Sequence, residues 1–246
     1  MSHNAIKIQE GAFVIADAHY SHLRSELLEF IKEIHSKKLK PTQLIFMGDI
    51  FDALFGGIKY TEEENRELID LIEDIAGFIE VIYFEGNHDF NLQAVFDKVK
   101  IFTISQQPVL CSYDDKKVYL AHGDFDGGFG YLVYTSLIRN RVLLFILRII
   151  DNLTNNAILK FVDKHLSKKN DCNEFTGFES FVENRIANKY ECAYFIEGHY
   201  HQNRSFKVND LTYINLAAFA CNQRYFIVKS FKDKELLEEN TFSKGI

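Results

Sequence analysis

The chain has 246 residues, a formal net charge of −7 and 47% hydrophobic residues. This acidic balance argues against a nucleic-acid-binding protein, and the hydrophobic content, with only two prolines, argues against a disordered chain. The length is enough to bury a sizeable core. We therefore expect one domain over residues 1–246, with residues 125–190 as an insertion where the pattern of strands and helices changes.

Strands and helices alternate through the first hundred residues. Apolar runs predict strands over residues 12–16, 44–47 and 78–83. Helical spacing of apolar residues and local breakers predict helices over residues 21–38, 61–77 and 92–98. The second of these helices is expected to begin with a capping box at Thr61-Glu62-Glu63-Glu64.

Further strands are predicted on both sides of the insertion. Before it, they are expected over residues 102–104, 109–112 and 117–121, and Tyr113-Asp114-Asp115-Lys116 suits a hairpin turn between the last two. After it, strands are expected over residues 193–196, 211–216 and 224–230. The charged segment from Lys232 onwards is expected to be a frayed end.

The insertion is expected to be helical, with helices over residues 131–150, 157–169 and 178–190. The longest apolar run of the first helix is six residues, far below the roughly 20 needed to span a bilayer. This helix is either buried in the core or amphipathic and in contact with lipid, with phosphates facing Arg139, Arg141 and Arg148. A basic stripe, which serves either solubility or an anionic partner, is formed by Lys160, Lys164 and Lys168.

Five of the predicted strands end in short polar clusters, at the strand end where open α/β sheets bind ligands. The clusters are Asp17-Ala18-His19, Gly48-Asp49-Ile50-Phe51-Asp52, Gly86-Asn87-His88-Asp89, His122-Gly123-Asp124 and Gly198-His199-Tyr200-His201. Each alone has an ordinary structural interpretation, such as a helix-capping Asp or a surface His. Five of them in one chain instead predict one site assembled from five loops.

The clusters contain side chains that bind metals. Seven are potential ligands, namely Asp17, His19, Asp49, Asn87, His122, His199 and His201. Their mixed oxygen and nitrogen donors suit Mn²⁺, Fe²⁺ or Zn²⁺ better than Ca²⁺ or a thiolate-type zinc site. Because seven ligands exceed the need of one ion, we predict two divalent ions that share one carboxylate.

At these residues the chain resembles the calcineurin-like metallophosphoesterases, whose motifs D-x-H, G-D-x-x-D, G-N-H-[DE], H-G-D and G-H-x-H all occur here in order. The resemblance implies an α/β sandwich of two mixed β-sheets flanked by helices. It implies hydrolysis of a phosphoester by a water activated by two metal ions, with Mn²⁺ favoured. One ion would be held by Asp17, His19, Asp49 and His201, and the other by Asp49, Asn87, His122 and His199.

The same resemblance assigns roles to two further residues. His88 would face the substrate phosphate, where it either stabilises charge or protonates the leaving oxygen. Asp52 would orient His88 and keep it protonated. Both are predicted catalytic residues.

The apolar insertion gives the chain a more specific resemblance, to the UDP-2,3-diacylglucosamine pyrophosphohydrolases of lipid A biosynthesis. In that family the insertion is a lid that holds acyl chains, and the products are UMP and 2,3-diacylglucosamine 1-phosphate. This implies a nucleotide-linked glycolipid substrate and peripheral association with the inner membrane. The predicted substrate-binding residues are Asn87, Tyr131, Arg139 and Arg141. The commonest branch of the family has Arg where this chain has His88.

Two other functions compete with this assignment. A soluble phosphodiesterase or phosphatase would share the metal ligands but would not need the apolar insertion. A non-catalytic scaffold of the same fold would be expected to lose ligands, and here all seven are present.

The cysteines and the start of the chain bear on the compartment. Four cysteines without C-x-x-C spacing predict free thiols in a reducing compartment, and they are Cys111, Cys172, Cys192 and Cys221. The polar first seven residues lack the apolar segment of a signal peptide, so we expect a cytoplasmic protein.

Overall fold

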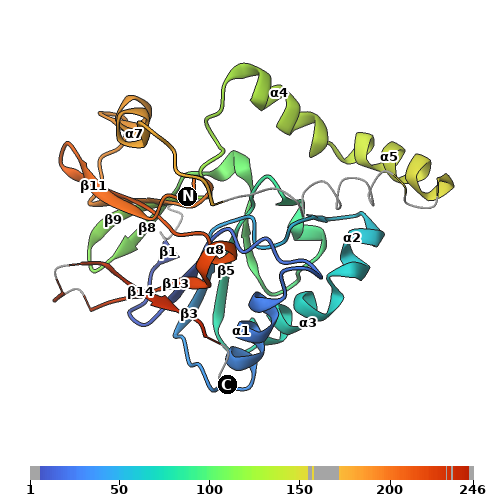
Figure 1. The fold of residues 1–246 in the computed structure, drawn as a ribbon, viewed down its shortest axis with the longest axis horizontal. Coiled ribbons are helices and arrows are strands. Elements are labelled where there is room, and N and C mark those ends of the chain that lie inside the picture. The colour runs from blue at the N-terminus through green and yellow to red at the C-terminus, as the bar shows by residue number, and fades with distance from the viewer. Residues whose placement is uncertain (1–5, 155–156, 158–171, 231, 234, 244–246) are drawn as a thin grey trace, which may run out of the picture.

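The computed structural model describes residues 6–154, 157, 172–230, 232–233 and 235–243. Two six-stranded mixed sheets form the centre of the described part (Figure 1). The first sheet has the order β1 (Ile6–Lys7), β8 (Val109–Tyr113), β9 (Lys116–Ala121), β10 (Tyr194–Glu197), β12 (Leu211–Asn215) and β11 (Arg204–Val208). The second has the order β14 (Leu237–Thr241), β13 (Arg224–Val228), β2 (Phe13–Ile15), β3 (Gln43–Phe46), β5 (Glu80–Phe84) and β7 (Lys100–Phe102). A separate parallel pair consists of β4 (Leu54–Phe55) and β6 (Asp89–Phe90).

Helices cover both sheets and extend beyond them (Figure 1). Within the described residues, the α-helices are α1 (Glu26–His35), α2 (Lys59–Glu64), α3 (Arg66–Ile75), α4 (Phe129–Ile138), α5 (Arg141–Leu153), α7 (Phe178–Ile186) and α8 (Phe219–Asn222). Two 3₁₀ turns are η1 (Leu92–Ala94) and η2 (Ile104–Gln106). The predicted fold class, an α/β sandwich of two mixed sheets flanked by helices, is confirmed.

The central strands have apolar side chains on both faces because both faces are buried. Along β3, Leu44 and Phe46 point into a core shared with α1 and α3, whereas Ile45 belongs to the core between the two sheets. Strands β2 and β5 alternate in the same way. A third core lies on the outer face of the first sheet, under α7. The described part of the chain therefore has four layers, and the loops at the strand ends lie at the rim of the central core.

The predicted capping box at Thr61 is wrong. Thr61 lies inside α2, and its hydroxyl donates to the carbonyl of Ile58 at 2.9 Å instead of capping a helix start. The predicted helix over residues 61–77 is two helices, α2 and α3, that meet at Asn65. The Asn65 side chain bonds the carbonyls of Thr61 and Ala53, and such side-chain bonds to the backbone compete with a continuous helix. The short helix predicted over residues 92–98 is only the single turn η1.

The first helix of the insertion is also two helices. It divides between α4 and α5 because the side-chain oxygen of Asn140 accepts hydrogen bonds from the backbone N–H groups of Val142 and Leu143, at 2.9 and 3.1 Å. This is the geometry of an N-terminal helix cap, so a new helix begins there. The predicted helix over residues 157–169 and its basic stripe lie outside the described residues, apart from residue 157.

The predicted frayed end from Lys232 is wrong, because β14 pairs antiparallel with β13 along its whole length. Its sequence, Leu-Glu-Glu-Asn-Thr, has the charged character of an edge strand. Such a strand has no apolar alternation that would reveal it in the sequence. Strands β1 and β11 were likewise not predicted.

The prediction of four free thiols is also wrong. Cys172, which precedes α7, and Cys221, in α8, form a disulfide across 49 residues, while Cys111 and Cys192 are free. A bond between residues so far apart depends on the tertiary fold and leaves no local spacing in the sequence. The thiol pattern therefore gives no support to the predicted reducing compartment.

The insertion is fastened to the first sheet by an ion-pair network. Arg185 of α7 donates to both carboxylate oxygens of Glu197 at the end of β10, and its Nε donates to Asp126 at 2.7 Å. Glu197 is fully buried and also accepts from the hydroxyl of Tyr213 at 2.8 Å. Burial raises the pKa of Glu197, and Arg185 opposes that shift. The network fixes the strand end that immediately precedes Gly198-His199.

Candidate metal centre

The predicted ligands follow the carboxyl ends of parallel strands. In the second sheet, β2, β3 and β5 are neighbours and are followed by Asp17 with His19, Asp49, and Asn87. In the first sheet, β9 and β10 pair in parallel and are followed by His122, and by His199 with His201. Parallel neighbours end at the same edge of a sheet, so each sheet gathers its own ligands at one edge. The two edges meet, since the N–H of His199, after a strand of the first sheet, donates to the carboxylate of Asp17, after a strand of the second.

The structure brings six of the seven predicted ligands into two groups of three. Within each group, the donor atoms lie within 4.8 Å of one another. The first group is Asp17, His19 and His201, and the second group is Asp49, His122 and His199. Asn87 lies beside the second group, with its Oδ1 3.4 Å from Nε2 of His122.

Hydrogen bonds connect the two groups through the backbone. The carbonyl of Asp49 accepts from the N–H of His19 at 3.0 Å, and the carboxylate of Asp17 accepts from the N–H of His199 at 2.9 Å. The Asp49 carboxylate itself lies in the second group, where one oxygen is 3.5 Å from Nε2 of His122. Its predicted role as the ligand shared by both ions stays a prediction.

Three glycines allow the loops to approach the ligand side chains. A Cβ atom on Gly86 would lie 2.2 Å from Oδ1 of Asp49, and one on Gly198 would lie 2.5 Å from Oδ2 of Asp17. A Cβ on Gly48 would lie 2.4 Å from Nδ1 of His122. These distances are too short for any other residue, so the Gly of each motif is required by the side chain of another loop.

The ligand loops hold several non-glycine residues in the left-handed backbone region. The φ angles are 50° for Asp17, 45° for His19, 51° for Asp49, 61° for His199 and 58° for His201. Non-glycine residues rarely adopt such angles, and each costs of order 1–3 kcal/mol. Strained residues of this kind concentrate at functional sites, where the surrounding fold holds them.

The charges of the site suit cation binding. Burial raises the pKa of Asp49, but the imidazoles of His122 and His88 outweigh it and hold that pKa well below its usual range. Burial likewise opposes the ionisation of Asp17, and His201 outweighs it, so the pKa of Asp17 is lowered. Burial lowers the pKa of His199 to about 4. The carboxylates are therefore ionised and His199 is neutral near pH 7, which are the forms that bind metals. Burial lowers the pKa of His122, but the Asp49 carboxylate outweighs it and raises that pKa well above its usual range, so a metal ion would have to displace a proton from His122.

The donor set therefore fits a pair of divalent metal ions. Two carboxylates, one amide and four imidazoles converge at one edge of the sandwich, and they come from strands of both sheets. Such mixed donors are typical of Mn²⁺, Fe²⁺ and Zn²⁺ sites.

The predicted catalytic residues lie beside the first group. Nδ1 of His88 is 2.9 Å from the backbone carbonyl of Asp52, and 3.7 Å from its carboxylate. The same carboxylate is 3.5 Å from Nδ1 of His19. The orientation of His88 by Asp52 thus comes from the carbonyl, while the carboxylate lies between two imidazoles.

Two of the predicted substrate-binding residues meet next to the metal site. The hydroxyl of Tyr131 donates to Asp124 at 3.1 Å, and Nη2 of Arg139 donates to the carbonyl of Gly86 at 2.8 Å. Arg139 also contacts Asp124, at 3.3 Å. Among the described residues, nothing accepts from its buried Nε and Nη1. Asn87, also predicted to bind substrate, lies beside the second group. The side chain of the fourth, Arg141, lies outside the described part of the structure.

Asp89 has a structural role that the sequence analysis did not assign. Its fully buried carboxylate accepts from the N–H groups of Asp49, Ile50, Phe51 and Gly86, and from the hydroxyl of Tyr83. It therefore fixes the two loops that carry Asp49 and Asn87. The only sequence feature that pointed to a role for Asp89 is its position at the end of the G-N-H-D motif.

Replacing Asp89 with Ala is expected to lower the free energy of unfolding by about 3–5 kcal/mol, because it leaves several buried N–H groups without an acceptor. Urea unfolding followed by circular dichroism measures the change. Asp97→Ala, at an exposed position nearby in sequence, is the matched control and should stay within about 0.5 kcal/mol of the parent. Equal stability of the two variants would contradict the role assigned to Asp89.

Comparison with known proteins agrees with this geometry. A model of the calcineurin-like phosphoesterase family matches residues 12–203. The chain is 22% identical over 194 residues to a UDP-2,3-diacylglucosamine hydrolase of Pseudomonas fluorescens, covering 77% of this chain and 78% of that one. It is 29% identical to the enzyme of the same name from Haemophilus influenzae, over 46% of this chain and 48% of that one. A third, from Ralstonia nicotianae, is 24% identical over 48% of this chain and 45% of its own length.

Solved structures with the same kind of fold are more distant. An archaeal phosphodiesterase has a TM-score of 0.46 at 14% identity, covering 94% of this chain and 99% of its own. A phosphoesterase from E. coli has a TM-score of 0.43 at 11% identity, with coverage of 94% and 99%.

Proposed function

Since the chain belongs to the calcineurin-like phosphoesterase family, we propose that it hydrolyses the pyrophosphate of UDP-2,3-diacylglucosamine to UMP and 2,3-diacylglucosamine 1-phosphate. Family membership makes the chain a metal-dependent phosphoesterase, and the names of its curated relatives support this particular substrate. The observation that carries the proposal is an exposed apolar surface joined directly to the metal site.

That surface lies on the two helices that extend from the sandwich in Figure 1. On α4 and α5, large apolar side chains face solvent, with exposed fractions of 68% for Val142 and 53% for Phe145. The others are Val133, Leu137, Ile146, Ile149 and Ile150. Contiguous exposed apolar side chains mark binding surfaces for apolar partners. Arg139, at the end of α4, connects this surface to the Gly86 loop, as a lid over acyl chains requires.

The metal ions proposed here are two divalent cations, with Mn²⁺ favoured, held by the two groups and Asn87. When bound, they would supply an activated water and positive charge for the phosphoryl oxygens. The chain's own residues would then position the substrate. Arg139 has Nε and Nη1 available for a phosphate oxygen, and the ring of His88 lies against that of His19 in the first group, with the centroids 4.8 Å apart.

Association with a membrane surface is part of the proposal. Among the described helices, none combines the length and apolar character needed to cross a bilayer. The apolar side chains of α4 and α5 would instead enter the interface of the inner membrane from the cytoplasmic side, as amphipathic helices do. There they would meet the acyl chains of the substrate.

The protein is expected to sediment with phospholipid vesicles, and Phe145→Glu is expected to reduce the bound fraction several-fold, because a charge replaces an inserted ring. Phe78→Glu is the matched control, since Phe78 is a comparably exposed phenylalanine outside the insertion. If both variants bind phospholipid vesicles equally, α4 and α5 are not the membrane contact.

The activity itself is tested by incubating the protein with UDP-2,3-diacylglucosamine and Mn²⁺ and measuring UMP release, with and without a chelator. UMP release that the chelator abolishes is the expected result. If a simple aryl phosphodiester is hydrolysed but no UMP appears, the metal site stands and the glycolipid substrate is wrong. The alternative of a soluble phosphodiesterase or phosphatase would then hold.

A further inference from the structure

Gln107 bonds two ligand loops that follow strands of different sheets. The residue lies between η2 and β8 and is 8% exposed. Its Oε1 accepts from the backbone N–H of His122, after β9 of the first sheet, at 2.6 Å. Its Nε2 donates to the carbonyl of Glu85 at 2.8 Å, directly after β5 of the second sheet and shortly before Asn87. One side-chain amide therefore joins the backbones that carry His122 and Asn87, which are predicted ligands of the same metal ion.

The bond from Gln107 completes the fixation of His122. Nδ1 of the His122 ring lies 2.9 Å from the carbonyl of Met47, and the backbone carbonyl of His122 accepts from the N–H of Gly198 at 2.9 Å. With Nδ1 bonded to Met47, Nε2 is the ring nitrogen left for a metal ion, and it lies 3.4 Å from Oδ1 of Asn87. The remaining backbone group, the N–H, is the one that Gln107 holds. Gln107 therefore helps to set the position of the His122 donor atom relative to the Asn87 loop.

The bridge needs the chemistry of an amide. The N–H of His122 requires an acceptor, whereas the carbonyl of Glu85 requires a donor, and a glutamine side chain supplies both. The Nε2 group also reaches the carbonyl of Phe102, at 3.4 Å. Methionine has a side chain of similar length but only a weakly accepting sulfur. Gln107→Met therefore removes the bridge, fills most of its space and leaves every predicted ligand unchanged.

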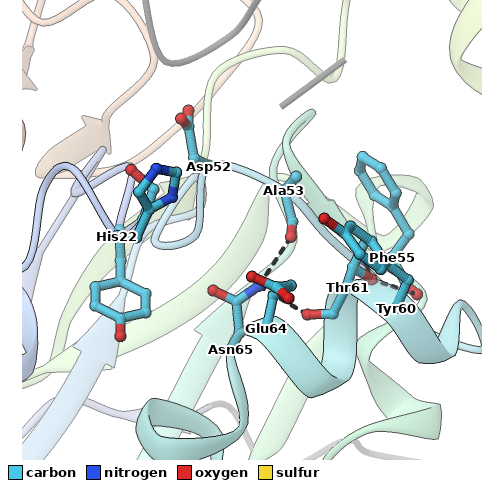
Figure 2. A pocket seen from close by; sticks show the side chains of 10 residues that line it. His22, Asp52, Ala53, Phe55, Tyr60, Thr61, Glu64 and Asn65 are labelled. Carbon is cyan, nitrogen blue, oxygen red and sulfur yellow. Dashed lines mark hydrogen bonds between the residues drawn. The ribbon is translucent and has the colours of Figure 1, made fainter. Parts of the chain in front are cut away.

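Two other buried amides make comparable bridges and allow the effect of this one to be isolated. Gln43, at the start of β3, donates to the carbonyl of Lys7 in the first sheet and to the carboxylate of Glu80 in the second. It thus joins the same two sheets at the end of β3 away from the metal site. Asn65 donates to the carbonyl of Ala53 at 3.0 Å, the bond drawn between these two residues in Figure 2. All of these acceptors lie outside the predicted ligand set.

We propose that Gln107 is a positioning residue for the second metal group, whose affinity for its ion depends on the bridge between His122 and Glu85. The inference rests on the proposed pair of metal ions and not on the glycolipid substrate. Residues that bond and orient metal ligands commonly contribute a factor of about 10–100 to metal affinity. The first group contains neither His122 nor Asn87, so it is expected to keep its affinity when the bridge is removed.

The test titrates the metal-free protein with Mn²⁺ and follows free Mn²⁺ by its electron paramagnetic resonance signal. The parent is expected to bind a pair of ions per chain in two steps. Gln107→Met is expected to weaken one of these steps by about 10–100-fold and to leave the other unchanged. The affected step should be the one that Asn87→Ala also weakens, because Asn87 lies beside the second group.

Gln43→Met is the matched control, since it removes a buried bridging glutamine at the other end of the same sheets. It is expected to lower stability in urea but to keep both binding steps. Asn65→Leu removes the amide seen in Figure 2 and should likewise keep both steps. Gln107→Asn retains the amide but is one methylene group shorter, so it cannot span both loops. It is expected to weaken the same step as Gln107→Met, and it carries the test if Gln107→Met does not fold.

The outcomes separate the role of Gln107 from the proposed function. Unchanged binding steps in Gln107→Met and Gln107→Asn would overturn the positioning role and leave the proposed pair of ions intact. Equal weakening in Gln107→Met and Gln43→Met would also overturn it, because the effect would then follow from general stability. A parent that binds fewer than two ions contradicts the proposed pair, and this inference with it. Selective weakening of one step, in a protein that does not hydrolyse the glycolipid, supports the role of Gln107 and contradicts only the substrate.

Discussion

Replacing Asp49 with Ala is expected to lower phosphoester hydrolysis by at least about a thousandfold and to remove bound metal. Two bound ions supply several kcal/mol of charge stabilisation to the transition state, and each loss of about 1.4 kcal/mol is a factor of ten in rate. The Asp49 carboxylate is the only one in the second group, where its partners are His122 and His199. Without it, two imidazoles and the Asn87 amide would have to hold a divalent cation with no carboxylate in the group.

The measurement is metal content per chain by elemental analysis, together with turnover of an aryl phosphodiester. Asp70→Ala, which removes an exposed carboxylate from α3, is the matched control and should keep both metal and turnover. Some loss of stability is expected in Asp49→Ala, about 1–3 kcal/mol, since the N–H of His88 loses its acceptor. Full metal content in a folded Asp49→Ala protein would mean that the second group is not a metal site.

The metal-ligand residues could be predicted because each is marked by a pattern in its own neighbourhood of the sequence. A donor such as Asp17 or His199 stands within a few residues of a strand end, and parallel strands bring their ends together without any further information. The strands that carry the ligands, β2, β3, β5, β9 and β10, lie within about two residues of their predicted bounds. The sequence does not reveal why the motifs need their glycines. The loop geometry shows that Gly48, Gly86 and Gly198 make room for side chains of other loops.

The features that were missed depend on contacts distant in the sequence. Asp89 acts through N–H groups up to 40 residues away, and the Cys172–Cys221 disulfide spans 49 residues. Neither residue of such a contacting pair lies in a sequence pattern that identifies its partner. Strand β14 was missed for a different reason, since a charged edge strand has the composition of a frayed end.

The break between α4 and α5 shows how a single side chain can change the function of a segment. The sequence predicts one long helix through Asn140, but the Asn140 side chain caps the start of α5, directly after Arg139, whose guanidinium donates to the carbonyl of Gly86. A continuous helix would present Arg139 as one of several surface cations. The break makes it instead the contact between the apolar helices and the metal-site loop.

His88→Ala is expected to lower turnover by about 10²–10⁴-fold while leaving most of the metal bound, because general acid–base groups contribute about that much. His88 is not among the predicted ligands, and its Nδ1 faces the carbonyl of Asp52. If Nδ1 carries the proton donated to that carbonyl, Nε2 is the ring nitrogen left for a substrate oxygen. Metal content and turnover are measured as for Asp49→Ala. Loss of both metals in His88→Ala would make His88 a structural residue.

His88→Arg then distinguishes the two roles predicted for this position. A guanidinium stays charged at all accessible pH values, so it can stabilise charge on a phosphoryl oxygen but cannot transfer a proton to a leaving group. Recovery of most of the lost turnover in His88→Arg would mean that His88 acts by its charge. If His88→Arg is as slow as His88→Ala on an aryl phosphodiester but much faster on one with a more acidic leaving group, His88 acts as a proton donor. Because better leaving groups need less protonation, the ratio of the two rates decides between the roles.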